Sequence, residues 1–139
     1  MNRFQTTIHI QAPQDRIWKI LTDASAYTSW NTTVEKVEGR IALGGKIKLF
    51  VKLNPGKAFP VTVSTLEAPR QMVWTGGMPF GLFKGERTYS LTPRDGGVEF
   101  SMVEVFSGLM APLITKSIPD LQPAFDEFGA CLKRRAEQG

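Results

Sequence analysis

Two residues of opposite charge, Arg87 and Glu104, fall on segments that read as β-strands, residues 86–92 and 98–106. Side chains alternate between the two faces of a strand, and the positions sharing a face with these charges are otherwise apolar or aromatic. An isolated ion in apolar surroundings costs several kcal/mol, so we expect each charge to have a polar partner. Chemically, Glu104 could act as a general acid or base, Arg87 could polarise a carbonyl, and Tyr89 could donate a proton.

The distance between these charges depends on how the two segments pair. An Asp-Gly dipeptide between them predicts a β-hairpin. Pairing Leu91 with Val98 places Arg87 opposite Met102 and makes Glu104 its diagonal neighbour on the interior face. Two interpretations stay open: the charges orient a ligand inside the fold, or they form an ion pair near the rim, in this register or one shifted by a residue. Burial raises a carboxyl pKa and a nearby guanidinium lowers it, so the pattern leaves the protonation state of Glu104 open.

Short strands make up most of the chain. In the clearest strand, Ile47, Leu49 and Val51 alternate with lysines, a pattern typical of a strand with one buried face. The connections are too short for crossovers, so the sheet is predicted to be antiparallel. The predicted strands are residues 3–11, 34–40, 45–53, 60–67, 71–75, 86–92 and 98–106.

Helical periodicity occurs near both ends of the chain. The first helix starts at Pro13 and is followed by an aromatic break that includes Tyr27 and Trp30,. The last helix carries one broad apolar stripe, which needs a large concave apolar partner. Its members are Leu121, Phe125, Phe128 and Leu132. The predicted fold is a single α+β domain over residues 1–139, a curved antiparallel sheet in the order β-α-β6-α around the C-terminal helix, with an internal cavity.

An unusual apolar loop is predicted at residues 76–83, which contain three glycines, one proline and four large apolar side chains. Loops usually carry polar residues, so this one could be a flap over an apolar ligand. Alternatively, Phe80 and Phe83 simply plug the end of the barrel.

The sequence lacks the residues that several classes of function require. One histidine and one cysteine do not make a usual metal site or a disulfide, and neither a phosphate-binding loop nor a Gly-x-Ser-x-Gly motif occurs,. A net charge of +4 is mild, and the aromatics fall on interior faces, so no nucleic-acid partner is expected,. The sequence has neither a signal-peptide pattern nor a membrane-spanning stretch, so a cytoplasmic protein without stable membrane insertion is expected. Its oligomeric state stays open, with a homodimer as one option.

Several short motifs together resemble the START-like, or SRPBCC, superfamily and its polyketide cyclase/dehydrase-type branch. They are Ala12-Pro13, Ile17-Trp18, Leu21, Asp23, Tyr27, Trp30-Asn31, Trp74-x-Gly76, Gly85-Glu86, Gly97, Glu104-x-Phe106-x-Gly108 and residues 132–137. The resemblance implies a helix-grip fold with a deep cavity for lipids, sterols or polyketides, and in some members cyclisation or dehydration. Such relatives often have a histidine at the position of Arg87. Any acid–base role that this histidine carries in them is therefore in doubt for this chain.

The first hypothesis is a binding protein for a small hydrophobic or amphipathic ligand, without catalysis and without a cofactor or metal. The second is a cyclase/dehydratase-type enzyme using Glu104, Arg87 and Tyr89, and the third is a lipid-transfer or protein-interaction module using residues 76–83. The predicted ligand-binding residues are Trp30, Leu49, Trp74, Phe80, Phe83, Arg87, Tyr89, Met102, Glu104, Leu121, Phe125 and Phe128.

Overall fold

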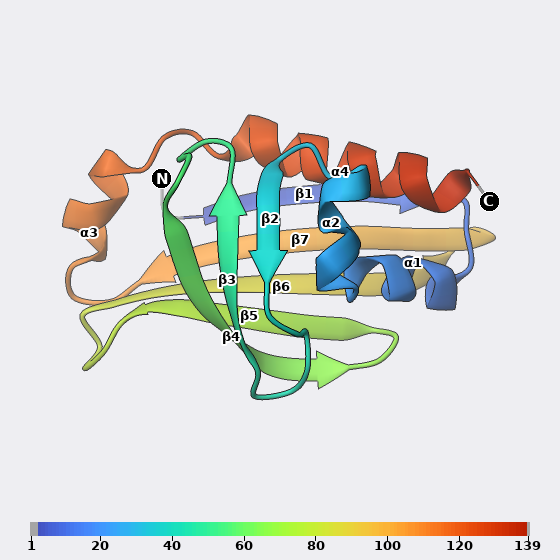
Figure 1. Cartoon of the computed structure of the whole chain (residues 1–139). Helices are drawn as coiled ribbons and strands as arrows, with labels where there is room; N and C mark the ends of the chain where they lie inside the picture. The colour runs from blue at the N-terminus through green and yellow to red at the C-terminus, as the bar shows by residue number, and fades with distance from the viewer. Residues whose placement is uncertain (1–2, 139) are drawn as a thin grey trace.

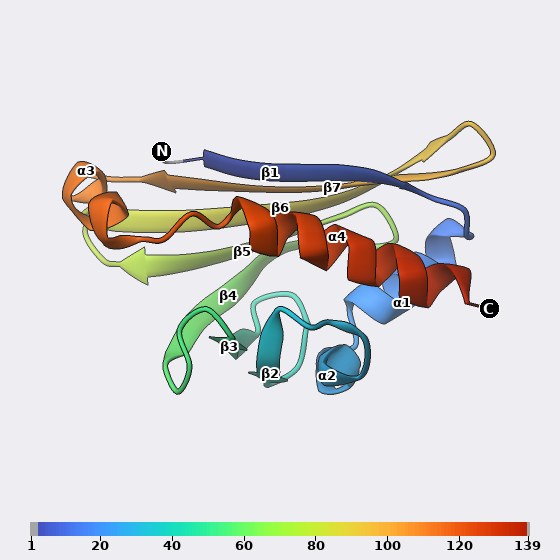
Figure 2. The ribbon, with the colours of Figure 1, turned by 90° about the horizontal axis from the view of Figure 1, so that it is seen from above.

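The computed structural model of the chain describes residues 3–138 and contains one antiparallel sheet of seven strands. The sheet is curled and leaves one concave face toward the helices (Figures 1 and 2). In spatial order the strands are β1, β7, β6, β5, β4, β3 and β2. Their bounds are β1 Arg3–Ile10, β2 Val34–Glu38, β3 Lys46–Val51, β4 Ala58–Glu67, β5 Gln71–Met78, β6 Phe83–Arg94 and β7 Gly97–Ser107.

The longest helix, α4 (Gln122–Glu137), crosses the concave side of the sheet (Figure 2). Helices α1 (Gln14–Leu21) and α2 (Tyr27–Trp30) lie toward one end of the molecule, and α3 (Ala111–Ile114) lies at the other (Figure 1). Two short 3-10 turns, η1 (Ala24–Ala26) and η2 (Thr115–Ser117), complete the order. The predicted α+β class and β-α-β6-α order are therefore confirmed. Among residues 3–138, no helix combines the length and apolar character needed to cross a membrane.

The turn between β6 and β7 corrects the predicted register. Asp95 and Gly96 have φ angles of 51° and 79°, positive at both positions as in the two-residue type I′ hairpin turn. The five-residue loop assumed from the sequence is therefore only two residues long, and Leu91 pairs with Phe100 rather than with Val98. The predicted pairing was wrong by two residues. Because side chains alternate with a period of two, the interior face keeps its members.

Helix α4 packs mainly along β1. Three members of the predicted stripe, Phe125, Phe128 and Leu132, are buried, whereas Leu121 precedes α4 and is only partly buried. Gly129 faces β1, and a Cβ built there would lie 3.4 Å from Cγ2 of Ile8. A side chain longer than that of alanine would therefore press against β1.

Only half of the apolar segment 76–83 is loop, and the other half belongs to β5 and β6. β5 continues through Met78 and β6 begins at Phe83, so only residues 79–82 form the connection. Glycine permits this extension: a Cβ on Gly76 would lie 2.8 Å from the carbonyl oxygen of Pro60 on the neighbouring strand.

Substitutions of Gly129 test this packing. We expect Gly129→Ala to change the free energy of unfolding by less than about 1 kcal/mol, because a methyl group meets only ordinary contacts and alanine favours helix,. Gly129→Leu should cost about 1–3 kcal/mol or more, because the longer side chain pushes α4 away from β1. Urea denaturation measures both, and equal stability of the two variants would contradict the close approach.

Candidate functional site

The two charges singled out in the sequence face each other across β6 and β7. Arg87 and Glu104 are directly paired in the ladder. The Nε–H of Arg87 donates to Oε1 of Glu104 at 2.6 Å, and Nη2 lies 2.6 Å from the same oxygen. Their side chains are only 17% and 14% exposed. The pair is therefore largely shielded from solvent, and it lies inside both strands rather than at a strand end.

Helix α4 covers this pair with an aromatic ring. The guanidinium carbon of Arg87 lies 4.8 Å from the centre of the Phe125 ring, a cation–π distance. On the other side, Glu104 Oε2 lies 3.4 Å from where a Cβ of Gly85 would be. Among the described residues, no N–H or O–H group donates to Oε2, since both Arg87 contacts use Oε1. One carboxylate oxygen is thus left available for another partner.

Two further polar atoms in this neighbourhood are buried without a hydrogen-bond partner among residues 3–138. They are the Tyr89 hydroxyl and the Trp74 indole nitrogen. The two rings are in contact, with centroids 4.9 Å apart, and Trp74 pairs with Arg87 in the ladder. Buried polar groups are nearly always hydrogen-bonded. Two unpaired donors beside an ion pair therefore mark this part of the interior as unusual.

Burial and charge act on the ionisation of these groups. Burial raises the pKa of Tyr89 to about 12, although the Arg87 guanidinium beside its hydroxyl acts in the opposite direction. Burial alone would lower the pKa of Arg87, but the Glu104 carboxylate outweighs it and the pKa is raised. Arg87 consequently stays charged and Tyr89 stays protonated at neutral pH.

Aromatic side chains fill the space between the sheet and α4, where the sequence predicted an open cavity. Phe128 of α4 lies at the centre, with Tyr27, Trp30, Tyr89 and Phe100 around it at centroid distances of 5.7–6.3 Å. Such rings pack closely in edge-to-face and stacked arrangements. The hydroxyl of Tyr27 donates to the carbonyl oxygen of Leu21. Closely packed rings therefore occupy the place where the sequence predicts a ligand cavity.

A second row of rings leads away from the ion pair toward α3. Phe125 contacts Phe4, Phe4 contacts Phe106, and Phe106 stacks on Phe83, with centroids 5.9, 6.4 and 5.7 Å apart. Phe83 is half-buried, whereas the other three are buried. This aromatic row connects the charged centre with one end of the molecule.

The structure brings together most of the residues predicted to bind a ligand. Trp74, Arg87, Tyr89, Met102, Glu104, Phe125 and Phe128 lie on the facing surfaces of the sheet and α4. Trp30 and Leu49 are buried in the same core, and Leu121 and Phe83 are partly buried at its margin. Phe80 is not among them, because its side chain is almost fully exposed. Phe4, Phe106 and Tyr27 also belong to this aromatic region but were not predicted as ligand-binding residues. The alternation of side chains along β1 and β7 could have identified Phe4 and Phe106.

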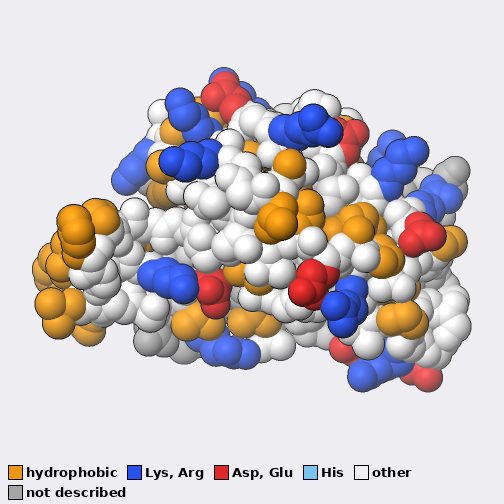
Figure 3. Space-filling model, turned by 90° about the horizontal axis from the view of Figure 1, so that it is seen from below, with side chains coloured by type: hydrophobic (Ala, Val, Ile, Leu, Met, Phe, Trp, Pro, Cys, Tyr) orange, Lys and Arg blue, Asp and Glu red, His pale blue; other side chains and the backbone are white. Residues whose placement is uncertain are grey.

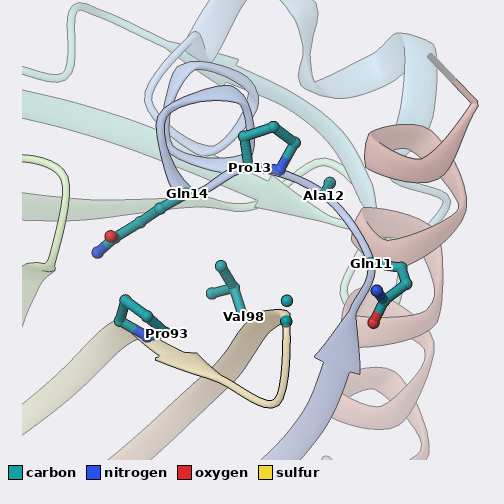
Figure 4. A pocket seen from close by; sticks show the side chains of 8 residues that line it. Gln11, Ala12, Pro13, Gln14, Pro93 and Val98 are labelled. Atoms are coloured by element: carbon teal, nitrogen blue, oxygen red, sulfur yellow. The ribbon is translucent and has the colours of Figure 1, made fainter.

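Two surface hollows lie away from this centre. One, of about 490 Å³, is a groove between the β1–α1 connection and the β6–β7 hairpin, lined by residues including Pro13, Pro93 and Val98 (Figure 4). Gln14 at its side donates to the carbonyl oxygens of Pro69 and Leu91. Its lining contains no titratable side chain. This groove therefore offers shape but no acid–base chemistry.

The other hollow, of about 340 Å³, lies between α2, β2 and the end of α4. It has basic residues at Lys52, Arg134 and Arg135, and an acidic one at Glu35. Basic residues in the last turn of a helix are favoured by the helix dipole without any ligand.

Removing the buried charges tests their coupling. Arg87→Met or Glu104→Leu alone should lower the free energy of unfolding by about 3 kcal/mol, because each leaves a buried charge unpaired. The double variant should return to within about 1 kcal/mol of the parent. The exposed pair Arg94–Glu99, 2.7 Å apart, is the control and should show coupling below about 1 kcal/mol,. Urea unfolding of each set gives these energies, and additive losses at Arg87 and Glu104 would contradict the pairing.

Alkaline titration tests the burial of the two tyrosines, which are the only ones in the chain. Burial raises the pKa of both, that of Tyr89 to about 12. A raised folded-state pKa contributes stability below the unfolded value of 10.0, and this stability is lost as pH rises through the folded-state pKa. We expect tyrosinate absorbance to stay flat near pH 10 and to rise together with loss of near-ultraviolet circular dichroism. A tyrosine that ionises near pH 10 in the folded protein would contradict this burial.

Known proteins were compared with this chain by sequence and by structure. A profile of the family described as polyketide cyclase / dehydrase and lipid transport matches residues 1–137. Among curated proteins, none matches this sequence.

Several solved structures share the fold at low sequence identity. A hypothetical protein, jhp0584, from Helicobacter pylori superposes with a TM-score of 0.79 at 13% identity, covering 97% of this chain and 88% of its own. A START superfamily protein from Mycobacterium smegmatis gives 0.74 at 18% identity, covering 99% of each chain. The di-domain ARO/CYC StfQ from the steffimycin biosynthetic pathway gives 0.72 at 11% identity, covering 98% of this chain and 51% of its own. The chain therefore belongs to the polyketide cyclase / dehydrase and lipid transport family and has the helix-grip fold of the START superfamily.

Proposed function

We propose that this protein binds a small hydrophobic or amphipathic ligand between the sheet and α4, with the polar end of the ligand at Arg87, Glu104 and Tyr89. The observation that carries the proposal is the group of unpaired polar atoms at this place. The Tyr89 hydroxyl and Trp74 Nε1 are buried without partners, and Glu104 Oε2 receives no hydrogen bond from residues 3–138.

The charges favour a neutral polar group on the ligand. A carboxylate would approach Glu104, whose negative charge is already matched by Arg87, and like charges repel strongly in an apolar interior. A carbonyl or hydroxyl oxygen can accept hydrogen bonds from Tyr89 and Trp74, and a hydroxyl can also donate to Glu104 Oε2. The ligand class that fits is thus an apolar molecule with keto or hydroxyl groups.

Binding requires rearrangement of the aromatic row. Phe83 and Phe106 stack at the margin of the core, and Phe83 is only half-buried. Phenylalanine rings have no hydrogen bonds to break, so a ligand can displace them and replace their apolar contacts with its own. The ligand would then follow the row from Phe83 to Phe125.

A cyclase/dehydratase-type reaction is the second candidate, supported by the unpaired Oε2 of Glu104. That oxygen could accept a proton from a carbon next to a carbonyl group while Arg87 stabilises the developing negative charge on the carbonyl oxygen. The enolate carbon could then form a bond to a second carbonyl carbon of the same molecule, and the Tyr89 hydroxyl, kept protonated by burial, could give its proton to the alkoxide formed there. This role would make Glu104 catalytic as well as binding.

A matched pair of probes tests the binding proposal. We expect 2-naphthol to bind more tightly than naphthalene, because only the former can hydrogen-bond at Tyr89. Tyr89→Phe should weaken 2-naphthol roughly tenfold, about 1.4 kcal/mol, and leave naphthalene unchanged. Fluorescence titration gives both affinities, and Arg94→Met at the exposed hairpin is the control. Equal affinity for both probes in the parent protein, or no binding of either, would refute the proposal.

Glu104→Gln separates binding from catalysis, because it keeps the shape of the side chain and removes its ability to take up a proton. Turnover of a poly-keto substrate that is lost while 2-naphthol still binds would establish the enzyme. Unchanged turnover would remove Glu104 from any mechanism.

A further inference from the structure

Four large apolar side chains are exposed together at the α3 end of the molecule. Phe80 is 95% exposed, Leu109 82%, Leu113 64% and Met78 47%. Figure 3 shows hydrophobic side chains gathered at this end, at the left of the view. We call this group, from the β5–β6 connection and the segment after β7, the apolar tip.

Backbone hydrogen bonds give the segments of the apolar tip a defined conformation. The turn of residues 79–82 is closed by a hydrogen bond from Leu82 N–H to the Pro79 carbonyl oxygen at 3.2 Å. It is joined to the segment after β7, since Leu109 N–H donates to Gly81 O at 3.0 Å and Met110 N–H donates to Leu82 O at 2.7 Å. Backbone hydrogen bonds thus hold the two segments as one unit.

Nothing within the described chain accounts for this exposure. Phe80 has a φ angle of 61°, a left-handed conformation that is uncommon for a bulky residue. Its side chain gains no packing in return. An exposed cluster of this kind marks a surface that contacts something outside the chain.

Size and shape favour a bilayer over a protein. Four partly exposed side chains offer roughly a few hundred Å², whereas a stable protein interface buries about 800 Å² on each partner. The tip lies at the end of the molecule, beyond the ends of β6 and β7 (Figure 1). A small protruding apolar group of this kind suits insertion into a fluid interface more than a flat contact with a second copy.

Charge adds a preference for anionic lipid. Residues 76–83 and 105–119 contain no aspartate or glutamate. Two basic residues are close to these segments in the sequence: Lys84, whose exposed pair with Glu86 spans 3.1 Å, and Lys116, which is exposed on η2 without a described ion pair. An exposed lysine near an anionic bilayer contributes about 1 kcal/mol of attraction.

We propose that the apolar tip docks this protein on the surface of a bilayer that contains anionic lipid. Phe80, Leu109 and Leu113 insert among the headgroups and upper acyl chains, and Lys84 and Lys116 lie at the headgroups. The aromatic row begins at Phe83 directly after the tip, so docking brings its outer end to the bilayer. The docking does not depend on the ligand proposed above and is measurable with vesicles alone.

Vesicle co-sedimentation tests the docking, with the full chain and vesicles of phosphatidylcholine alone or mixed with phosphatidylglycerol. We expect binding to the mixed vesicles, and a loss of at least tenfold for Phe80→Ser because burying a phenylalanine ring contributes about 1.5–3 kcal/mol. Lys116→Gln should weaken binding to the mixed vesicles about fivefold and leave binding to phosphatidylcholine unchanged. Leu43→Ser is the control, because Leu43 is 67% exposed elsewhere, on the β2–β3 connection.

Three results would overturn the docking. They are no binding of the parent protein to mixed vesicles, equal weakening by Leu43→Ser and Phe80→Ser, and a dimer in solution that Phe80→Ser dissociates. Urea unfolding of each variant shows that the fold is intact. Affinity for 2-naphthol, expected to be unchanged in Phe80→Ser without vesicles, separates failure of the docking from failure of the ligand proposal.

Discussion

A charged pair buried under an aromatic helix face imposes the main constraint on this fold. Arg87 and Glu104 are tolerable in the interior only when they face each other, because the loss of either leaves an uncompensated ion. The pairing of the charges therefore favours one register of β6 against β7. The ring of Phe125 on α4 contacts the same pair through Arg87. The long apolar stripe of α4 then closes the concave face, and the short N-terminal helices fill the end of the core around Tyr27 and Trp30. The same pair provides the polar feature around which a ligand would be oriented.

Much of the architecture follows from local patterns in the sequence. The alternation of Ile47 and Leu49 with lysines, and the spacing of Phe125, Phe128 and Leu132, each specify an element and its buried face. The family follows from the order of weak motifs over the whole length, confirmed by the profile match to residues 1–137. Arg87 and Glu104 were identifiable because charge is rare on an apolar face.

Other features depend on contacts between distant segments and were not predictable in this way. The register at Arg87 is an exception, because Asp95-Gly96 is a dipeptide typical of the two-residue type I′ turn, and a turn of that length gives the observed pairing,. The extension of β5 and β6 through the glycine-rich segment depends on the close neighbour strand at Gly76. Whether the space under α4 is open or filled depends on side-chain packing that no periodic pattern encodes. The exposure of Phe80 likewise depends on the backbone bonds that join its turn to the segment after β7.

The two-residue turn at Asp95-Gly96 has a consequence for how sequences of this kind can vary. A slip of β7 by one residue would send Glu104 to the solvent side and Val105 inward. A slip by two residues would restore the faces but move Glu104 past Arg87. An insertion at this turn is therefore compatible with the charged pair only where a longer loop takes it up and leaves the register unchanged. A lineage in which β7 has slipped against β6 should also have replaced the charged pair, so the register and the residues at 87 and 104 should change together.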